Sequence, residues 1–308
     1  MKSFIFIDKE KGAFGKVLDN KLYELKFYNP DLHNIYRARV VDKIDSINAY
    51  FLLYEDDKKA FLKTRKKFKI GDSVIGQIIK EGFDEKLATF SANFRIENDH
   101  YYLYRFKNRG YPRLKKGQKK DQKAYNDLVK LKEKLIREEN FSPSPKLLKE
   151  ISQFEIYKKE NEDIDIVSLD IKNNMVIKDG LDSIKNDKLY KDGMSIIINE
   201  LETMTVVDIN SSKKKSKMKK DDFFYWVNKS MVDLIFFNLN LRNIGGMVVI
   251  DFLRSLRNDE LLAEIEKSLE KYFDKFEIYG FTKMGLFEIS LKREGKPLKE
   301  NLKKLGLI

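Results

Sequence analysis

The hydrophobic pattern of residues 34–96 consists of short apolar stretches separated by polar turns. Stretches of this kind, bounded by turn-forming residues, are typical of β-strands. Five strands that follow one another closely in sequence indicate a small barrel of the OB type. The predicted strands are 35–41, 49–54, 59–62, 73–80 and 86–91.

The regions on either side of this barrel have weaker patterns. Residues 2–28 predict two or three short strands, which are too few to build a core by themselves. Residues 107–150 are rich in lysine and interrupted by prolines, and they predict one helix at 122–139 with flexible arms. After that region, 164–171 and 195–198 again have the character of strands.

Two longer apolar stretches, 204–210 and 247–252, predict buried strands, and each carries one aspartate near its C-terminal end. Apolar residues recur at helical spacing over 223–241, and Gly245-Gly246 then ends the predicted helix. The order of elements is therefore strand, helix, strand.

A right-handed crossover of this type makes its two strands parallel, so their C-terminal ends lie at the same end of the sheet. Asp208 and Asp251 are therefore expected to meet. In an extended strand the residue two positions on points the same way, so Asn210 is placed to hold one oxygen of Asp208 with its amide.

Two neighbouring carboxylates repel each other unless a cation lies between them. Mg²⁺ fits this pair best, because it accepts one or two carboxylates, keeps several waters and bridges to phosphate; Mn²⁺ is the expected substitute. Such an ion polarises a phosphoryl oxygen and activates water, so the pair indicates phosphodiester hydrolysis. The alternative is structural: each aspartate caps the turn or helix that follows its strand.

The charge of the chain favours a polyanionic partner. The sequence has 61 lysines and arginines against 49 aspartates and glutamates, a net charge of +12. Residues 101–150 contain 15 basic and 6 acidic side chains, and such a positive field most often binds nucleic acid. Lys213, Lys214 and Lys215 begin a lysine run just after the first aspartate strand, which suits phosphate contacts. The alternatives are a generally basic composition and a solvated loop.

The composition also excludes several classes of chemistry. The sequence contains no cysteine, which excludes disulfides, thiolate nucleophiles and cysteine-bound zinc, and its two histidines are His33 and His100. No apolar stretch reaches the roughly 20 residues needed to cross a bilayer. Residues 4–7 are too short for the core of a signal peptide. We therefore expect a cytoplasmic protein without a membrane partner.

Two motifs resemble those of the ribonuclease E/G family. Residues 202–210 (ETMTVVDIN) resemble the first catalytic motif of that family, and residues 241–252 (LRNIGGMVVIDF) resemble the second. The stretch 285–290 (GLFEIS) follows in the order that the family has. The resemblance implies an endonuclease that cleaves single-stranded RNA and leaves a 5′-phosphate.

The resemblance also implies roles for single residues. Asp208 and Asp251 would bind Mg²⁺, and Asn210 would support one of them through a hydrogen bond. Arg242 stands where the family has an arginine that contacts RNA, although a charge at a helix C-terminus also satisfies the helix dipole. Lys283 stands where an RNA-contacting arginine is usual, and lysine cannot form the same bidentate phosphate contact.

The resemblance extends to the barrel. Residues 34–40 (NIYRARV) resemble the first strand of the family's RNA-binding OB domain. In that domain two surface aromatic rings stack on bases, and the matching residues are Phe51 and Phe61; Lys86 matches a basic contact residue. Stacking suits a binder that tolerates any sequence, because every base has a π-face. The alternative for both phenylalanines is ordinary core packing.

The fold implied by the resemblance is an α+β multidomain fold. An RNase H-like subdomain would carry the OB-fold barrel as an insertion, and a DNase I-like α/β catalytic subdomain would follow. The expected boundaries are 1–33 and 164–200 for the RNase H-like subdomain, 34–96 for the barrel, 97–163 for a shortened, lysine-rich helical insertion and 201–308 for the catalytic subdomain.

Three departures from the family pattern limit these implications. Residues 97–160 are shorter than the family's region for a 5′-monophosphate pocket, and its arginine–threonine element is not found. Because the cysteines of the family's zinc link and its C-terminal small domain are missing, we expect no zinc, and a monomer or weak dimer in place of a zinc-linked tetramer. Ser212 also replaces a glycine that is common after the first motif.

Two functions therefore stay open at this point. The first is a Mg²⁺-dependent endoribonuclease that acts in RNA processing or decay. The second is a non-catalytic RNA-binding or ribosome-associated protein of the same fold, favoured by the missing pocket and by Lys283. A metal-free nuclease based on His33 or His100 ranks last, since both histidines lie outside the motifs.

Overall fold

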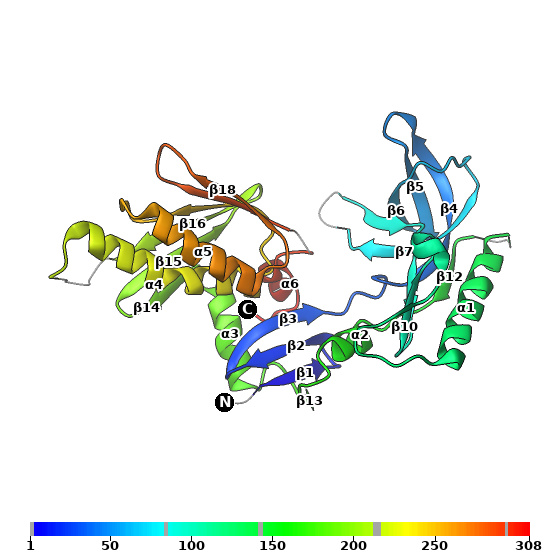
Figure 1. Ribbon diagram of the computed structural model, residues 1–308, viewed down its shortest axis with the longest axis horizontal. Helices are drawn as coiled ribbons and strands as arrows, with labels where there is room; N and C mark the ends of the chain where they lie inside the picture. Colours follow the sequence, from blue (N-terminus) through cyan, green and yellow to red (C-terminus); the bar gives the residue numbers. More distant parts are fainter. Residues whose placement is uncertain (1–2, 83–85, 141–143, 212–216, 293–294) are drawn as a thin grey trace. The chain divides into compact units, whose positions relative to one another are not determined.

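A computed structural model describes residues 3–82, 86–140, 144–211, 217–292 and 295–308 (Figure 1). The chain forms two compact units. Unit 1 contains Met1–Tyr28 and Asn161–Ile308, and unit 2 is the intervening segment Asn29–Glu160. Unit 2 therefore contains the predicted barrel together with the lysine-rich region that follows it.

Unit 2 contains a closed five-stranded barrel like that of an OB fold, as the apolar pattern predicts. β4 pairs with both β5 and β7, and β8 joins β6 to β7, so the strands form a closed ring. Side chains such as Tyr36, Leu52 and Ile78 fill its interior. β12 (Lys146–Lys149) pairs with β4 as an additional strand. The barrel strands are β4 (Ile35–Ile44), β5 (Ala49–Glu55), β6 (Lys58–Lys63), β7 (Ser73–Lys80) and β8 (Ala88–Ser91), with a 3₁₀ turn at Asp45–Ile47.

A second layer of unit 2 consists of a three-stranded antiparallel sheet packed against helix α1. α1 (Gln122–Arg137) begins after Asp121, whose carboxylate accepts a hydrogen bond from the backbone N–H of Ala124 at 2.8 Å. The predicted helix is confirmed, whereas the sheet is not predicted by the sequence pattern. The remaining elements are β9 (Arg95–Glu97), β10 (Tyr101–Tyr104), β11 (Arg113–Leu114), α2 (Gln153–Glu160) and 3₁₀ turns at Lys107–Gly110 and Glu138–Asn140.

Unit 1 contains a four-stranded sheet in the order β13, β1, β2, β3. The strands at the start of the chain form an antiparallel meander, and β1 pairs in parallel with β13, which lies far along the sequence. Phe6 and Val17 of this sheet pack with Ile177 and Leu181 of α3, so the opening strands share a core with a distant segment. The bounds are β1 (Phe4–Asp8), β2 (Ala13–Leu18), β3 (Lys21–Phe27), β13 (Ile166–Ser168), α3 (Met175–Lys185) and α6 (Leu298–Lys304).

The second sheet of unit 1 has six strands in the order β14, β15, β16, β17, β19, β18. β16 and β17 are parallel neighbours connected through α4, so the predicted crossover is confirmed. β15 forms an antiparallel hairpin with β16, and β14 pairs with β15; both therefore belong to this sheet, which corrects the expected boundary at residue 201. The bounds are β14 (Lys188–Lys191), β15 (Met194–Glu200), β16 (Met204–Asn210), α4 (Lys220–Leu241), β17 (Gly246–Asp251), α5 (Asn258–Tyr272), β18 (Phe276–Phe281) and β19 (Phe287–Leu291).

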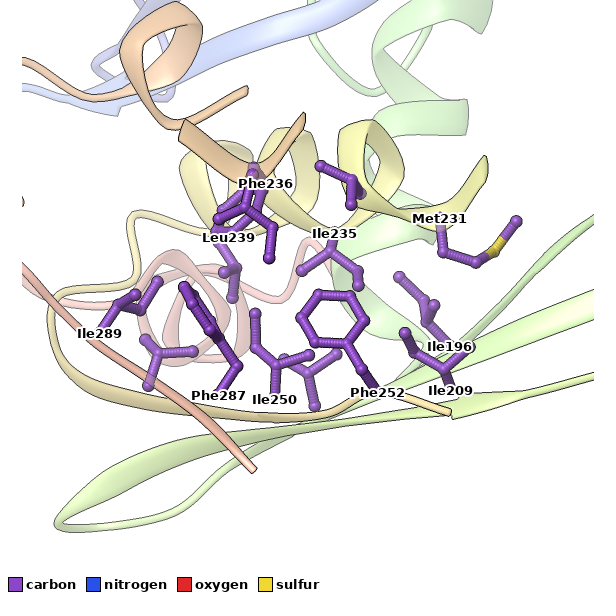
Figure 2. Close-up of a cluster of buried hydrophobic side chains, with 14 of the residues drawn as sticks. Ile196, Ile209, Met231, Ile235, Phe236, Leu239, Ile250, Phe252, Phe287 and Ile289 are labelled. Atoms are coloured by element: carbon purple, nitrogen blue, oxygen red, sulfur yellow. The ribbon is translucent and has the colours of Figure 1, made fainter. Parts of the chain in front are cut away.

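Helices α4 and α5 cover one face of the six-stranded sheet. Figure 2 shows Ile235 and Phe236 of α4 packed over Ile250 and Phe287 of the strands. Because successive strand residues point to opposite faces, this packing leaves the other face to the alternate residues of each strand. Among the helices of the described residues, none is long and apolar enough to cross a membrane.

Candidate active site

The two aspartates lie side by side at the ends of the central strands of the six-stranded sheet. β16 and β17 pair in parallel, and the register places Asp208 directly beside Asp251. Neighbouring strands lie about 4.8 Å apart, so aligned side chains on one face are immediate neighbours. Val207 and Ile250, which flank the aspartates, are buried under α4, so the carboxylates lie on the opposite face. Asp208 is partly exposed and Asp251 is exposed.

Asn210 orients one carboxylate of this pair. Its side chain lies on the same face as Asp208, two residues earlier in β16. The Asn210 Nδ2 atom donates a hydrogen bond to Oδ2 of Asp208 at 2.5 Å. This amide restricts the rotation of the Asp208 carboxylate, which fixes the direction of its oxygens before any ligand arrives.

The chain just after Asp251 is held by a buried amide of α4. Asn228 is fully buried, and its Nδ2 atom donates to the carbonyl of Leu253 at 2.7 Å while its Oδ1 atom accepts from the Leu253 N–H at 3.0 Å. Asp221, in the first turn of α4, accepts from the backbone N–H of Leu256 at 2.7 Å. These contacts fix the exit of β17 and so the position of Asp251. Sequence reasoning missed Asn228, although an asparagine inside an apolar helix is a recognisable signal.

Two exposed cations lie at the same sheet edge. Phe287 of β19 pairs with Ile250, the neighbour of Asp251, so the turn between β18 and β19 lies at the end of the sheet that carries the carboxylates. Lys283 is exposed in this turn. Arg254, three residues after Asp251, donates from Nη2 to the carbonyl of Met284 in the same turn at 3.4 Å. Sequence reasoning identified Lys283 and missed Arg254.

Arg242 has a structural role, which corrects the predicted RNA contact. Its side chain is 0% exposed. The guanidinium donates to Glu200 Oε1 at 3.0 Å and to the carbonyls of Ser183 and Asn186 at 2.9 and 2.7 Å. It thus joins the end of α4 to the end of α3 and to β15. A fully buried guanidinium with these partners is not available to an RNA phosphate.

The aromatic pair of the barrel lies in unit 2. Phe51 of β5 and Phe61 of β6 are cross-strand partners, and their ring centroids are 6.0 Å apart in an edge-on arrangement. Both side chains are partly exposed, and neither belongs to the buried barrel core, which the alternating residues Tyr50, Leu52 and Leu62 occupy. The two rings therefore lie on the outer surface of the barrel. Lys86 is exposed just before β8.

The remaining predicted residues lie outside the described ranges or in unit 2. Lys213, Lys214 and Lys215 lie outside the described residues, as does Ser212. His33 and His100 belong to unit 2, and the His100 ring contacts the carbonyl of Lys119 at 3.0 Å.

The donor set of the site suits a hard divalent cation. Within the described ranges, no group of three or more histidine, cysteine, aspartate or glutamate side chains is arranged to hold a metal ion. Asp208 and Asp251 thus offer carboxylates from only two residues, on an open face with space for water. Mg²⁺ binds through one or two carboxylates together with waters and substrate phosphates, so these residues fit it; a calcium cage or a structural zinc site requires more protein ligands.

The model of the ribonuclease E/G family matches residues 106–294 of this sequence. That range contains more than half of the chain, including Asp208, Asn210, Asp251 and Lys283. The chain belongs to this family. The aspartate pair and the turn with Lys283 therefore lie inside the family region, whereas Phe51 and Phe61 precede the matched range.

Individual members of the ribonuclease E/G family align with a shorter part of the chain. Ribonuclease G of Salmonella typhimurium (strain SL1344) is 36% identical over 101 residues, which cover 32% of this chain and 21% of that protein. Ribonuclease G of Escherichia coli (strain K12) is 35% identical over the same length. Ribonuclease E of Synechocystis sp. is 34% identical over 108 residues, 34% of this chain and 16% of that protein. The alignments thus span about a fifth or less of each relative.

Proposed function

We propose that this protein is a Mg²⁺-dependent endoribonuclease that hydrolyses single-stranded RNA and leaves 5′-phosphate ends. The observation that supports this most strongly is the parallel register of Asp208 beside Asp251, with Asn210 bonded to the first of them. Membership of the ribonuclease E/G family supports RNA as the substrate. RNA processing or decay is the corresponding role.

Each residue of the pair has a distinct task in this proposal. Asp208 and Asp251 would hold Mg²⁺, with Mn²⁺ as a substitute, and the bound ion would polarise the scissile phosphate and lower the pKa of an attacking water. Asn210 keeps the Asp208 carboxylate in one orientation. Hydrolysis breaks the bond between phosphorus and the 3′ oxygen, so the downstream product carries the 5′-phosphate. Asn228 holds the strand exit after Asp251 in place.

Substrate binding is assigned to exposed cations and rings. Lys283 and Arg254 lie at the carboxylate edge and would contact the RNA backbone without reading its sequence. Phe51 and Phe61, on the outer surface of the barrel, would stack on bases, and Lys86 would contact a phosphate. This division suits a nuclease that accepts many single-stranded sequences.

The finer features of the fold and assembly belong to the same proposal. The four-stranded sheet of unit 1 corresponds to an RNase H-like subdomain, and the six-stranded sheet with α4 and α5 corresponds to a DNase I-like catalytic subdomain. The sequence has no cysteine to bind zinc, so we propose that the protein acts without zinc, as a monomer or weak dimer. We also propose that it acts in the cytoplasm.

A second candidate is an RNA-binding or ribosome-associated protein that has lost turnover. One feature favours it: position 283 is a lysine, which cannot form the bidentate phosphate contact of an arginine. Such a protein would bind RNA with the same rings and cations. It would release no fragments in any divalent metal.

A cleavage assay separates these two candidates. One labelled RNA, prepared with a 5′-monophosphate or a 5′-triphosphate, is incubated with the wild type and Asp208→Asn in Mg²⁺, Mn²⁺ or EDTA. We expect the wild type to produce fragments with 5′-phosphate ends in either metal, and no fragments with EDTA or with Asp208→Asn. Binding without fragments in both metals would reject the nuclease in favour of the second candidate.

Asp274→Asn is the matched control for this assay. Asp274 is exposed just before β18. Phe276, the first residue of β18, pairs with Leu291 of β19, and Leu291 pairs with Gly246 at the start of β17. Asp274 therefore lies near the start of β17, at the opposite end of the strands from Asp251. The control removes one carboxylate charge from this sheet and should leave cleavage unchanged. A loss equal to that of Asp208→Asn would show a general charge effect instead of a metal site.

A further inference from the structure

The small sheet of unit 2 has a second aromatic surface. Tyr102 and Tyr104 alternate along β10 with Tyr101 and Leu103, which are buried against α1. Tyr102 and Tyr104 therefore lie on the opposite, outer face of the sheet. Both are partly exposed, and their ring centroids are 6.1 Å apart with the ring planes nearly perpendicular. We call Tyr102, Tyr104 and the cations beside them the tyrosine face.

Three cations lie against these rings. Tyr104 pairs in register with Arg95 of β9, and the Arg95 guanidinium lies over both rings, 5.2 Å from the centroid of Tyr102 and 5.9 Å from that of Tyr104. Lys107 lies over the Tyr104 ring at 5.0 Å. Arg113 of β11 is exposed and pairs in register with Tyr102. Aromatic rings and guanidinium planes thus alternate across one sheet surface.

One carboxylate on this face, that of Glu97, is already paired with cations. Glu97 pairs in register with Tyr102, binds Arg95 and accepts a hydrogen bond from Lys115 at 2.9 Å. Burial raises the pKa of Glu97, but the hydrogen bond from Lys115 and the charge of Arg95 outweigh it and hold the pKa below its usual value. Glu97 is therefore ionised and shared by two cations. Lys107, over the Tyr104 ring, adds a further positive charge to this face.

Core packing does not require this composition. Tyr101, on the inner face, serves the core: it stacks edge-on with Tyr125 of α1 and its hydroxyl accepts from the N–H of Asp121 at 3.1 Å. The outer residues belong to no buried cluster of the described residues. Aromatic rings on an outer sheet face, with cations among them, are the arrangement by which sheet-based RNA-binding modules stack unpaired bases.

We propose that the tyrosine face is a second binding surface for single-stranded RNA, distinct from Phe51 and Phe61. This inference rests on the proposed function in taking RNA as the ligand. Bases stack on the rings of Tyr102 and Tyr104 and on the Arg95 guanidinium, and Lys107 neutralises a backbone phosphate. Each of these contacts is made to a π-face or a phosphate, so the surface binds RNA without selecting a sequence.

The charge of the face identifies RNA as the occupant. A protein partner would bury the rings in an apolar contact and would have to desolvate the cations that lie over them, which is costly. A polyanion with flat bases satisfies rings and cations together. Binding to the tyrosine face therefore has two measurable components, one that depends on ring faces and one that depends on salt.

The ring component is tested by binding of fluorescent oligouridine in EDTA, with every variant made in an Asp208→Asn background so that the RNA stays intact. Tyr102→Leu with Tyr104→Leu should raise Kd at least about fivefold, because one stacked base contributes about that factor or more. The matched variant Tyr102→Phe with Tyr104→Phe retains both ring faces and should stay within about twofold of the parent.

The charge component is tested with one lysine and one arginine of unit 2. Lys107→Ala should raise Kd and reduce the dependence of log Kd on log salt concentration by about 0.7, the value for one neutralised phosphate of a single strand. Arg137→Ala is the control: Arg137 is exposed on α1, which packs against the other face of the same sheet. It should leave Kd and the salt dependence nearly unchanged.

A covalent readout keeps the proposal testable if a variant folds poorly. Ultraviolet crosslinking of the otherwise unmutated Asp208→Asn protein to the same oligouridine, followed by mass spectrometry, should place crosslinks on Tyr102 or Tyr104. Unchanged Kd in the leucine variant, or crosslinks confined to Phe51 and Phe61, would overturn the tyrosine face. Because these measurements involve no cleavage, a protein that never cuts RNA would reject the proposed nuclease without affecting this result. Failure of the parent protein to bind RNA would overturn both.

Discussion

The two units of the chain use their sheets in opposite ways. In unit 1, two parallel strands bring Asp208 and Asp251 to one edge of a sheet, where acidic groups are concentrated and helices cover the other face. In unit 2, strand pairing brings Phe51 against Phe61 and places Arg95 over Tyr102, so rings and cations occupy the outer faces. Unit 1 thus carries the proposed cation site, and unit 2 carries the proposed surfaces for a polyanion.

On the proposed function, this contrast assigns the chemistry to unit 1 and the stacking of bases to unit 2. A substitution in the carboxylate pair should alter turnover with little effect on RNA affinity. A substitution on the outer faces of unit 2 should alter affinity with little effect on turnover at saturating RNA. The following predictions test that separation, beginning with the largest expected effect.

Asp251→Asn should lower the rate of RNA cleavage at least about 1,000-fold, equivalent to about 4 kcal/mol of transition-state stabilisation. The amide keeps the shape of the side chain and removes the charge that the metal requires. Mn²⁺ binding, followed by electron paramagnetic resonance, should weaken in the same variant. RNA affinity in EDTA should stay within about threefold of the wild type. Tight Mn²⁺ binding or full activity would show that the metal is held elsewhere.

Arg242→Ala should destabilise the protein by about 3–5 kcal/mol, since it leaves Glu200 and two carbonyls without the cation that now pairs with them. Urea unfolding followed by circular dichroism measures this change. Arg254→Ala removes an exposed arginine and should cost less than about 0.5 kcal/mol. If Arg242 contacted RNA instead, its removal would weaken RNA binding and leave unfolding unchanged.

Replacing Phe51 or Phe61 by alanine should weaken RNA binding by about 1–3 kcal/mol for each base that loses its ring. The rate at saturating RNA should be unchanged, because neither residue belongs to the unit that carries the carboxylates. Tyrosine at either position retains the ring and serves as the control. Equal Kd for the alanine and tyrosine variants, measured by fluorescence anisotropy, would remove these rings from the binding surface.

The smallest predicted effect is on the start of helix α1, whose stabilisation by Asp121 should depend on pH. The hydrogen bond from the N–H of Ala124 holds the pKa of Asp121 below its usual value. A depressed pKa contributes stability that is present above the usual aspartate pKa and is lost as pH falls through the lower folded value. Asp121→Ala should therefore reduce the hydrogen-exchange protection of the first turn of α1 near pH 6, and the difference should shrink as pH falls below the usual aspartate pKa.

Asp127→Ala is the control for this measurement, because Asp127 is exposed on α1 away from the cap. It should leave the protection of the first turn unchanged at every pH. A difference between wild type and Asp121→Ala that persists at low pH would show that the carboxylate charge is not what stabilises this end of α1.

The barrel and the crossover could be predicted from sequence because both depend on local pattern. The five barrel strands are separated by turn-forming residues, and 204–210 and 247–252 are long apolar stretches on either side of a helical one. The parallel crossover that this pattern implies is enough to place Asp208 beside Asp251. The catalytic roles of these residues stay predictions.

The features that sequence reasoning missed depend on contacts between distant segments. β9 and β11 contain three and two residues, too few to produce a pattern, and the sheet gains its core from α1 and from barrel residues such as Ile35 and Ile75. The environment of Arg242 is set by Glu200, Ser183 and Asn186, and a motif match cannot show that these groups surround it. The polarity of Asn228 within an apolar helix is visible in the sequence, but its partner Leu253 is known only from the folded chain.

The interruption of unit 1 by unit 2 sets an order of events during translation. β1 leaves the ribosome early, yet its partner β13 is synthesised only after all of Asn29–Glu160. Because domains fold as units in the order of their synthesis, the ring-bearing surfaces form while both aspartates are still unmade. On the proposed function, a nascent chain therefore completes its surfaces for RNA before it contains the residues that would cleave RNA.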